Sequence, residues 1–412
     1  MSSSGWFLLF AFVGAACTVL ALWPPRRPAW LGPMVFFSAW LTSELAPWII
    51  VVQVLGTLVF VALGALGSWP GFVALAITLA SWCGLAGMVV ASARTGDRFA
   101  AAFAEDLGPD WREPVARAGI DRRLLLPGPR ARRGGIERIR NVPYAGDDLR
   151  RHQLDVWRSR DVGPDAPVLL QIHGGGWMTG NKDQQARPLL YHFAQQGWVC
   201  VAINYRLAPK AKWPDQLVDC KLALRWIREH VHEYGGDPEF VVATGGSAGG
   251  HLTALVGLTA NRPEYQPGFE SVDTSVRAIV PLYGVYDFLD RHGFRHGGDS
   301  FPKFAQKKII QAPPGEEAAM FAQASPLDQI HPGSPPALIV HGTNDVLAPV
   351  EEARLFAAEL RAQSDQPVVY VELPGAHHAF DLFHSARGLH VVAGIDDFLG
   401  RLLRHEGRVE RP

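Results

Sequence analysis

Charge is nearly absent from the first quarter of this chain. Of the 39 basic and 40 acidic side chains in the 412 residues, only Arg26, Arg27 and Glu44 lie within residues 1–93. The rest of the chain carries the other charges at a density that is ordinary for a soluble domain. This division excludes a uniformly soluble protein, a disordered chain and a repeat array.

A basic excess and paired cysteines are also lacking. The formal net charge is −1 and the arginines form only short clusters, so no nucleic acid is expected as a partner. The cysteines at 17, 83, 200 and 220 form no CxxC pattern, which argues against a zinc site and against a disulfide framework. We therefore expect no metal and no cofactor.

The apolar part, residues 1–93, is predicted to be a transmembrane helical region. The stretches 5–23, 47–68 and 69–93 each supply the ~20 apolar residues that cross ~30 Å of hydrocarbon. A removable signal peptide fits poorly, because no positively charged segment precedes the first stretch and further apolar stretches follow it. Residues 29–43 are shorter and contain Gly32-Pro33, which fits a fourth span, a re-entrant piece or an interfacial helix. About three spans are expected.

The arginines that flank these stretches predict an orientation. Arg26-Arg27 and the group Arg94, Arg98 and Arg112 both favour the cytoplasmic side. Three spans with an outside N-terminus satisfy both groups and place the rest of the chain in the cytoplasm. Residues 94–135 then form a connector, amphipathic over 99–106 and rich in Arg, Pro and Gly over 122–135, which we expect to lie near the lipid headgroups.

Residues 136–412 alternate short apolar runs with helical patterns. This alternation predicts an α/β domain with a mainly parallel sheet, helices on both faces and an active site beyond the carboxyl ends of the strands. Segment 288–334 interrupts the alternation and is expected to be a cap inserted over those strand ends. The expected strands are 136–144, 153–158, 168–172, 199–204, 240–244, 278–282, 337–340 and 368–373, and the expected helices are 184–196, 215–234, 248–259, 351–363 and 388–403.

Two glycine-rich motifs follow predicted strands. Gly245-Gly-Ser247-Ala-Gly249 lies between a strand and a helix, which is the setting of a nucleophile elbow. Glycines two places before and after the serine let neighbouring backbone approach closely. His173-Gly-Gly-Gly-Trp177 follows the strand at 168–172, and its unobstructed N–H groups suit an oxyanion hole. No Gly-Lys-Ser/Thr follows it, so a phosphate-binding loop is disfavoured.

An acid and a base follow two later strands. His341-Gly-Thr-Asn-Asp345 comes directly after residues 337–340, and His377-His378-Ala-Phe380 comes shortly after residues 368–373. The chain order Ser247, Asp345, His378 is the order of an α/β-hydrolase triad. Ser247 would be the nucleophile, His378 the general base and Asp345 the residue that orients it.

On these motifs the chain resembles the hormone-sensitive-lipase branch of the α/β-hydrolases, the bacterial carboxylesterases and lipases with an HGGG loop. The resemblance covers roughly residues 136–405 and includes Asn204-Tyr-Arg-Leu-Ala-Pro209. Members usually have Asp where this chain has Gly246, and often Glu where it has Lys210. The apolar half lies outside the shared region and resembles that of membrane-tethered esterases of actinobacteria.

The resemblance implies further site residues. The oxyanion donors would be the backbone N–H groups of Ala248, Gly175 and Gly176, with Gly174 as a further candidate. His173 and Trp177 would lie on the substrate side of the loop, supporting it or packing beside the pocket. The family pattern favours His378 over His377 as the base, because it places the base directly before a small residue and Phe.

Other polar residues carry less specific signals. Asp381 follows the histidine too closely to replace Asp345. Arg206 and Asp219 fit a structural ion pair, and Asp287 fits a hydrogen bond within the cap. The histidines at 292, 296 and 331 lack metal-ligand spacing and fit solvated loops.

The sequence thus predicts a membrane-anchored, multi-pass serine esterase that hydrolyses small or medium acyl esters through an acyl-enzyme. Its partners would be a small-molecule ester, which the anchor suggests is lipidic, and the membrane. Two alternatives remain at this point: an arylformamidase-like amidase, and a catalytically silent hydrolase scaffold used for binding.

Overall fold

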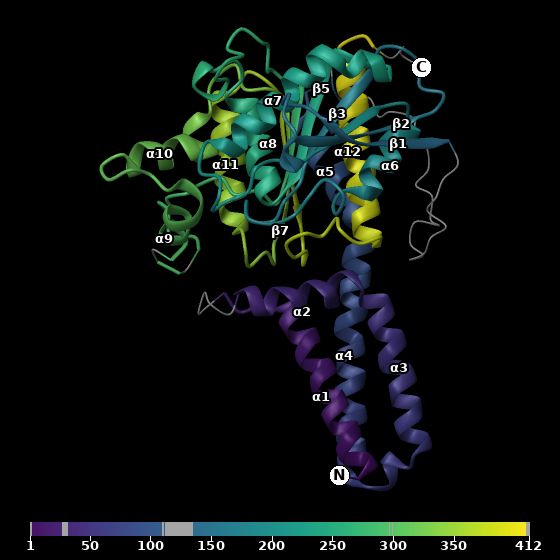
Figure 1. The fold of residues 1–412 in the computed structure, drawn as a ribbon. Helices are drawn as coiled ribbons and strands as arrows, with labels where there is room; N and C mark the ends of the chain where they lie inside the picture. Colours follow the sequence, from purple (N-terminus) through teal and green to yellow (C-terminus); the bar gives the residue numbers. More distant parts are fainter. Residues whose placement is uncertain are drawn as a thin grey trace.

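The computed structural model describes residues 2–26, 32–108, 111, 135–295, 297–298 and 300–408. It contains an N-terminal helical part and a larger domain built on one sheet (Figure 1). The helical part comprises α1 (Ser3–Leu22), α2 (Gly32–Glu44), α3 (Ala46–Ala62) and α4 (Trp69–Ala93).

Helices α1, α3 and α4 run side by side, and α2 lies across their ends beneath the sheet domain (Figure 1). By length and composition α1 and α4 are each able to cross a membrane, and the α2–α3 pair would make a third span bent by 86°. The described part of the 29–43 segment, from Gly32 onward, therefore forms a crosswise helix rather than a fourth parallel span. Gly32-Pro33 stands at the start of that helix and does not break it.

Helix α5 (Thr95–Asp106) follows α4 and forms the first part of the expected connector. It is amphipathic as predicted, but Phe99 and Phe103 on its apolar face are buried in the core of the sheet domain. Asp106 at its end accepts hydrogen bonds from the Tyr370 N–H and from Arg361. This part of the connector thus packs on the sheet domain, and its position relative to the headgroups stays a prediction. The predicted Arg-rich stretch lies largely outside the described residues.

The sheet has eight strands, each at a predicted position. They are β1 (Ile136–Pro143), β2 (Gln153–Ser159), β3 (Ala166–Ile172), β4 (Val199–Ile203), β5 (Gly236–Gly246), β6 (Ala278–Leu282), β7 (Ala337–Gly342) and β8 (Val368–Leu373). Their order is β1-β2-β4-β3-β5-β6-β7-β8. Only the β1–β2 and β2–β4 pairs are antiparallel, which confirms the mainly parallel α/β fold.

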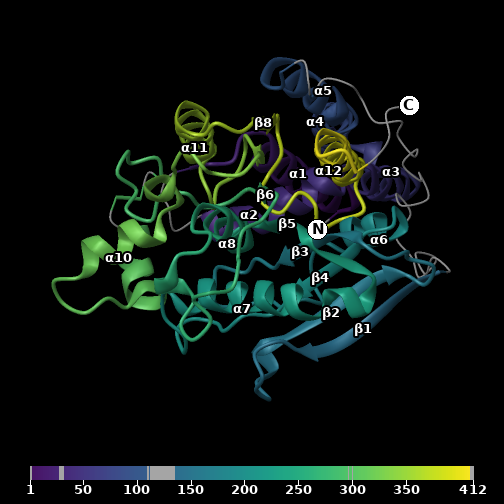
Figure 2. The same ribbon diagram turned by 90° about the horizontal axis from the view of Figure 1, so that it is seen from above.

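Helices cover both faces of this sheet (Figure 2). One face buries α7 (Asp215–His230), α8 (Ala248–Leu258) and α11 (Val350–Gln363) in a single apolar cluster. The other face buries α5, α6 (Arg187–Gln195) and α12 (Ala386–His405). The continuous apolar runs of the central strands are explained by this burial on both sides.

The predicted cap lies within the connection between β6 and β7. It contains α9 (Ser300–Ala305), a π-helical turn (Gln306–Ile310) and α10 (Glu317–Ala324). The connection is tied to the domain by hydrogen bonds from Trp213 N–H to the Ile309 carbonyl and from His251 to the Ala324 carbonyl.

Candidate active site

Ser247 occupies the sharp turn between β5 and α8. Its backbone has φ 59° and ψ −123°, a conformation that non-glycine residues rarely adopt. A Cβ on Gly245 would lie 2.5 Å from the Ile172 carbonyl oxygen, and one on Gly249 would lie 2.1 Å from the same atom. The glycines two places on either side of the serine are therefore required by close backbone contact, as the motif predicted.

Asp345 and His378 form a hydrogen-bonded pair. Nδ1 of His378 donates to Oδ2 of Asp345 at 2.7 Å. The other carboxylate oxygen, Oδ1, accepts the N–H groups of Leu347 and Ala348, each at 2.8 Å. The carboxylate is thus fixed on both oxygens, and Nε2 of His378 is left as the nitrogen able to accept a proton.

The charge state of Asp345 follows from these contacts. Burial alone would raise its pKa, but His378 and His341 beside the carboxylate outweigh burial and hold the pKa well below its ordinary value. Asp345 is therefore ionised at every pH at which the protein is expected to work.

Ser247 lies beside the glycine loop, but no hydrogen bond joins its hydroxyl to His378 within the described residues. A Cβ on Gly174 would lie 3.1 Å from the Ser247 Cβ. Catalytic hydrogen bonds are often long in ligand-free structures and shorten when substrate binds. The structure thus brings together Asp345 and His378, and separately Ser247 and the loop.

The glycine loop corrects one predicted donor. The Gly174 N–H donates to Oε1 of Gln185 at 2.7 Å, so it is not free to bind an oxyanion. Gly175 and Gly176, with φ of 122° and 60°, donate to no protein atom in the described part of the chain. The Ala248 N–H opens α8 and has no partner within that helix. Three N–H groups therefore remain as candidate donors.

His173 and Trp177 both make contacts that support the loop. His173 is fully buried, stacks on Tyr205 at 4.3 Å between ring centroids and contacts the Gly174 carbonyl through Nδ1. Burial lowers the pKa of His173 to about 4, so it is neutral. Trp177 is also buried and donates from Nε1 to His251. These contacts agree with the expectation that His173 supports the loop, and contact of either residue with substrate stays a prediction.

The two rivals for the acid and the base have other contacts. His377 is buried rather than exposed, and its Nε2 hydrogen-bonds to the carbonyl of Ala21 in α1 at 2.8 Å. Asp381 accepts a hydrogen bond from the hydroxyl of Tyr283. Removal from water raises the pKa of Asp381. Asp381 therefore does not take the place of Asp345 as the acid, and His377 does not take the place of His378 as the base.

Tyr283 is the site residue that sequence reasoning missed. Its ring meets the His378 ring edge-on, with 4.7 Å between centroids. A Cβ on Gly246 would lie 2.3 Å from the Tyr283 hydroxyl. The Tyr283 ring therefore fills the space that a side chain at position 246 would need. Gly at position 246, where the family pattern has Asp, was a signal that another side chain occupies this space. The sequence alone did not show which side chain that is.

The remaining predicted polar residues have structural contacts. Arg206 binds the buried carboxylate of Asp219 through Nε and Nη2, and Asp287 accepts the N–H groups of Leu289 and Arg291, as predicted. His296 lies outside the described residues. Among the residues that are described, no group of three or more His, Cys, Asp or Glu side chains is arranged to hold a metal ion.

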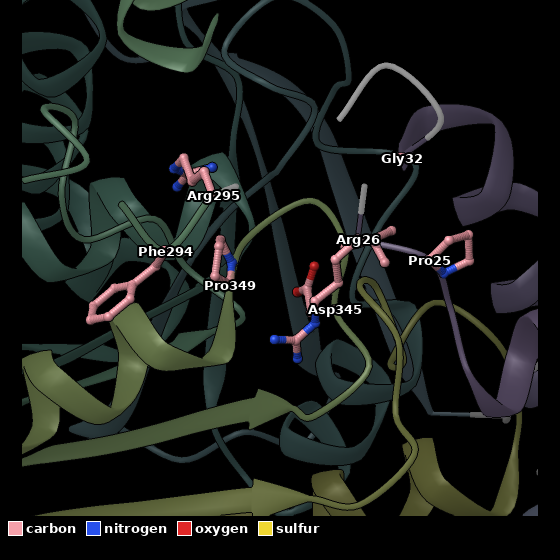
Figure 3. A pocket seen from close by; sticks show the side chains of 8 residues that line it. Pro25, Arg26, Gly32, Phe294, Arg295, Asp345 and Pro349 are labelled. Carbon is pink, nitrogen blue, oxygen red and sulfur yellow. The ribbon is translucent and has the colours of Figure 1, made fainter. Parts of the chain in front are cut away.

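A small cavity lies against Asp345 on the side of the helical part (Figure 3). Its volume is about 40 Å³, which leaves room for a few water molecules and excludes an acyl chain. Four parts of the chain form it: the segment after α1, the start of α2, the insertion before β7 and the Asp345 loop. Its lining includes Pro25, Arg26, Gly32, Phe294, Arg295, Asp345, Val346 and Pro349.

Comparisons with known proteins show the family of this chain. Residues 154–360 match the family model described as BD-FAE. The chain is 40% identical to a protein named probable carboxylic ester hydrolase LipM of Mycobacterium tuberculosis, over 98% of this chain and 95% of that protein. It is also 40% identical to esterase LipQ of the same organism, over 73% of each.

Among solved structures, the propionate-bound form of esterase Est2 from Thermogutta terrifontis is 27% identical. It has a TM-score of 0.54 and covers 68% of this chain and 97% of that chain. The match to LipM extends through the apolar helices, whereas Est2 matches a smaller share of the chain. With the strand order and the elbow described above, these similarities show that the chain belongs to the carboxylic ester hydrolases of the α/β-hydrolase fold.

Proposed function

We propose that this protein is a membrane-anchored serine esterase that hydrolyses esters of small to medium acyl chains through an acyl-enzyme. The observation that carries the proposal is the 2.7 Å hydrogen bond between His378 and the fixed carboxylate of Asp345. This bond leaves Nε2 of His378 able to accept a proton. Ser247, in the elbow after β5, would be the nucleophile that gives up this proton.

The reaction would proceed in two halves. Ser247 Oγ attacks the ester carbonyl carbon while Nε2 of His378 takes the hydroxyl proton. The N–H groups of Gly175, Gly176 and Ala248 stabilise the oxyanion that forms. The intermediate then collapses, the C–O bond to the alcohol breaks, and His378 returns the proton to the departing alcohol. Water repeats the sequence on the acyl-enzyme and releases the acid and free Ser247.

The preference for short acyl groups can be tested against the amidase alternative. We expect kcat/KM of the detergent-solubilised full chain to be highest for p-nitrophenyl acetate to octanoate and to fall towards palmitate. N-formylkynurenine should have a lower kcat/KM than p-nitrophenyl butyrate, because an enzyme discriminates between substrates by how well its pocket binds their transition states. The propionate seen in the Thermogutta esterase supports the short-chain preference. A faster reaction with N-formylkynurenine would favour the arylformamidase-like alternative.

The proposed topology has three crossings, with the N-terminus outside and the catalytic domain in the cytoplasm. The crossings are α1, the bent α2–α3 pair and α4. Within the bent pair, α3 would cross the membrane and α2 would lie at the interface. Support comes from the arginines: Arg26 after α1 contacts Glu351 of the catalytic domain, and Arg94 lies between α4 and α5. Both therefore lie at the end of the helices that the positive-inside tendency assigns to the cytoplasm.

Cysteine labelling can test this orientation. In a Cys17→Ser, Cys83→Ser background, Ser2→Cys should react with a membrane-impermeant maleimide on intact cells. Glu359→Cys, on the exposed side of α11, should react only after permeabilisation, because the catalytic domain is inside. Labelling of Glu359→Cys on intact cells would contradict the proposed side.

A further inference from the structure

We propose that the apolar N-terminal helices are part of the active site: the end of α1 and helix α2 position the loops that carry Asp345 and His378. Trp40 is the positioning residue for the base. This inference rests on the proposed function and goes beyond anchoring, because a tether would need no contact with the reacting groups.

The end of α1 binds Asn344 and His377, the residues that directly precede Asp345 and His378. The Ala21 carbonyl accepts from Nε2 of His377 at 2.8 Å and from Nδ2 of Asn344 at 3.0 Å, and the Leu22 carbonyl accepts from the same Asn344 nitrogen at 3.1 Å. The last carbonyls of a helix have no partner within it, so they are open to such donors. Burial lowers the pKa of His377 to about 4, so the ring is neutral. Its Nε2 then carries the proton that it donates to the Ala21 carbonyl. One helix end thus holds both loops.

Helix α2 binds the residue that follows the base. Nε1 of Trp40 donates to the Ala379 carbonyl at 2.9 Å. One turn earlier, Phe36 stacks on Trp40 and presents its ring to the edge of the His378 ring, with 6.0 Å between centroids. His378 is therefore held through α1 on its N-terminal side and through α2 on its C-terminal side.

A buried ion pair fixes the end of α2 on the catalytic domain. Glu44 lies 3.5 Å from Nε of Arg387 in α12 and accepts a hydrogen bond from Ser385 at 2.7 Å. Both charged side chains are 1% exposed. Because a charge is costly to bury without a partner, this contact requires α2 to sit where the structure has it. The position of Trp40, one turn before Glu44, follows.

The contacts gather on one edge of the domain. Arg26 donates to the Thr343 carbonyl, two residues before Asp345, and forms a salt bridge with Glu351. Thr343 and Asn344 belong to the loop that follows β7, His377 and Ala379 belong to the loop that follows β8, and Glu351 lies in the first turn of α11. The helical part therefore contacts the segments that carry the acid and the base, and a shift of the helices would be transmitted to both.

The test is Trp40→Phe in the full chain, with Trp48→Phe on α3 as the matched control. Trp48 is 47% exposed and lies outside this interface. Phenylalanine keeps an aromatic ring but loses the N–H bonded to Ala379 and part of the ring surface, and the control variant makes the same change in size. We expect kcat for p-nitrophenyl butyrate to fall about 10-fold with KM unchanged, since small misplacements of a catalytic group slow the chemical step and not substrate binding. Trp48→Phe should retain wild-type kcat.

A second variant and a second readout keep the result decisive. Asn344→Ala removes both bonds to α1 and should also lower kcat. Labelling of Ser247 by a fluorophosphonate should slow by the same factor as kcat, because that reaction also needs His378 to take the serine proton. Rates are expressed per labelled site at saturation, which removes any effect of misfolded protein. Wild-type rates per site in both variants would overturn the inference, whereas failure of the wild type itself to label would instead overturn the proposed function.

Discussion

Replacing Ser247 by alanine is expected to lower kcat for p-nitrophenyl butyrate by about 10⁶-fold, as removal of the nucleophile does in other serine hydrolases. This loss corresponds to about 8 kcal/mol of transition-state stabilisation. The oxyanion donors and the Asp345–His378 pair remain in place, so the residual rate would come from binding and electrostatic stabilisation alone. The measurement is steady-state hydrolysis by the full chain together with fluorophosphonate labelling, which should be absent in the variant.

The matched control is Ser275→Ala. The Ser275 hydroxyl bonds to Asp273 in a loop before β6, and its removal should leave both rate and labelling unchanged. Ser247 has positive φ, so a thermal unfolding curve of the variant should be recorded beside the kinetics. Turnover of Ser247→Ala near that of the wild type would exclude the acyl-enzyme proposal. An unlabelled wild type would favour the silent scaffold.

The strands and the elbow could be predicted because their signals are local. A run such as 199–203 is apolar throughout because both faces of β4 are covered, and the Ser247 turn requires glycine at 245 and 249 within five residues. The pairing of Asp345 with His378 was also predictable, because parallel strands deliver the residues after β7 and β8 to the same edge.

The contacts between the two halves were not predictable in this way. Hydropathy gives the length of an apolar segment but not the face that meets another domain, so α2 was open to three interpretations. Glu44 was the available signal: it is the single acidic residue of the first 93, and such a residue in an apolar segment usually has a specific partner. Its partner Arg387 is more than three hundred residues away, and only the fold brings them together.

The Gly174 and Tyr283 findings have a similar physical origin. Consecutive glycines look equivalent in sequence, but Gln185 reaches one of the three N–H groups and removes it from the oxyanion hole. Tyr283 follows β6, a strand to which no catalytic residue was assigned. Its role depends on the space left by Gly246 on the neighbouring strand.

Replacing Asp345 by asparagine should have the second largest effect, a fall in kcat of about 10⁴-fold. Oδ1 accepts two backbone N–H groups, so the side-chain oxygen of asparagine would remain there and its NH₂ would face Nδ1 of His378. His378 would then carry its proton on Nε2, the tautomer that cannot accept a proton from Ser247. The acid is held ionised in the native protein, because the histidines beside it keep the pKa of Asp345 well below its ordinary value despite burial. We therefore expect that the activity lost in Asp345→Asn does not return when the pH is raised within the neutral range.

Two matched variants identify Asp345 as the acid. Asp365→Asn, at an exposed position before β8, should leave kcat unchanged. Asp381→Asn keeps an acceptor for the Tyr283 hydroxyl and should cost far less than Asp345→Asn, because Asp381 hydrogen-bonds to Tyr283 whereas Asp345 hydrogen-bonds directly to His378. Steady-state kinetics of the three variants at neutral pH, expressed per labelled Ser247, provide the comparison. If Asp381→Asn were the variant that lost activity while Asp345→Asn retained it, the base would be oriented from the loop after β8 instead, and the assignment of the acid to the β7 edge would be wrong.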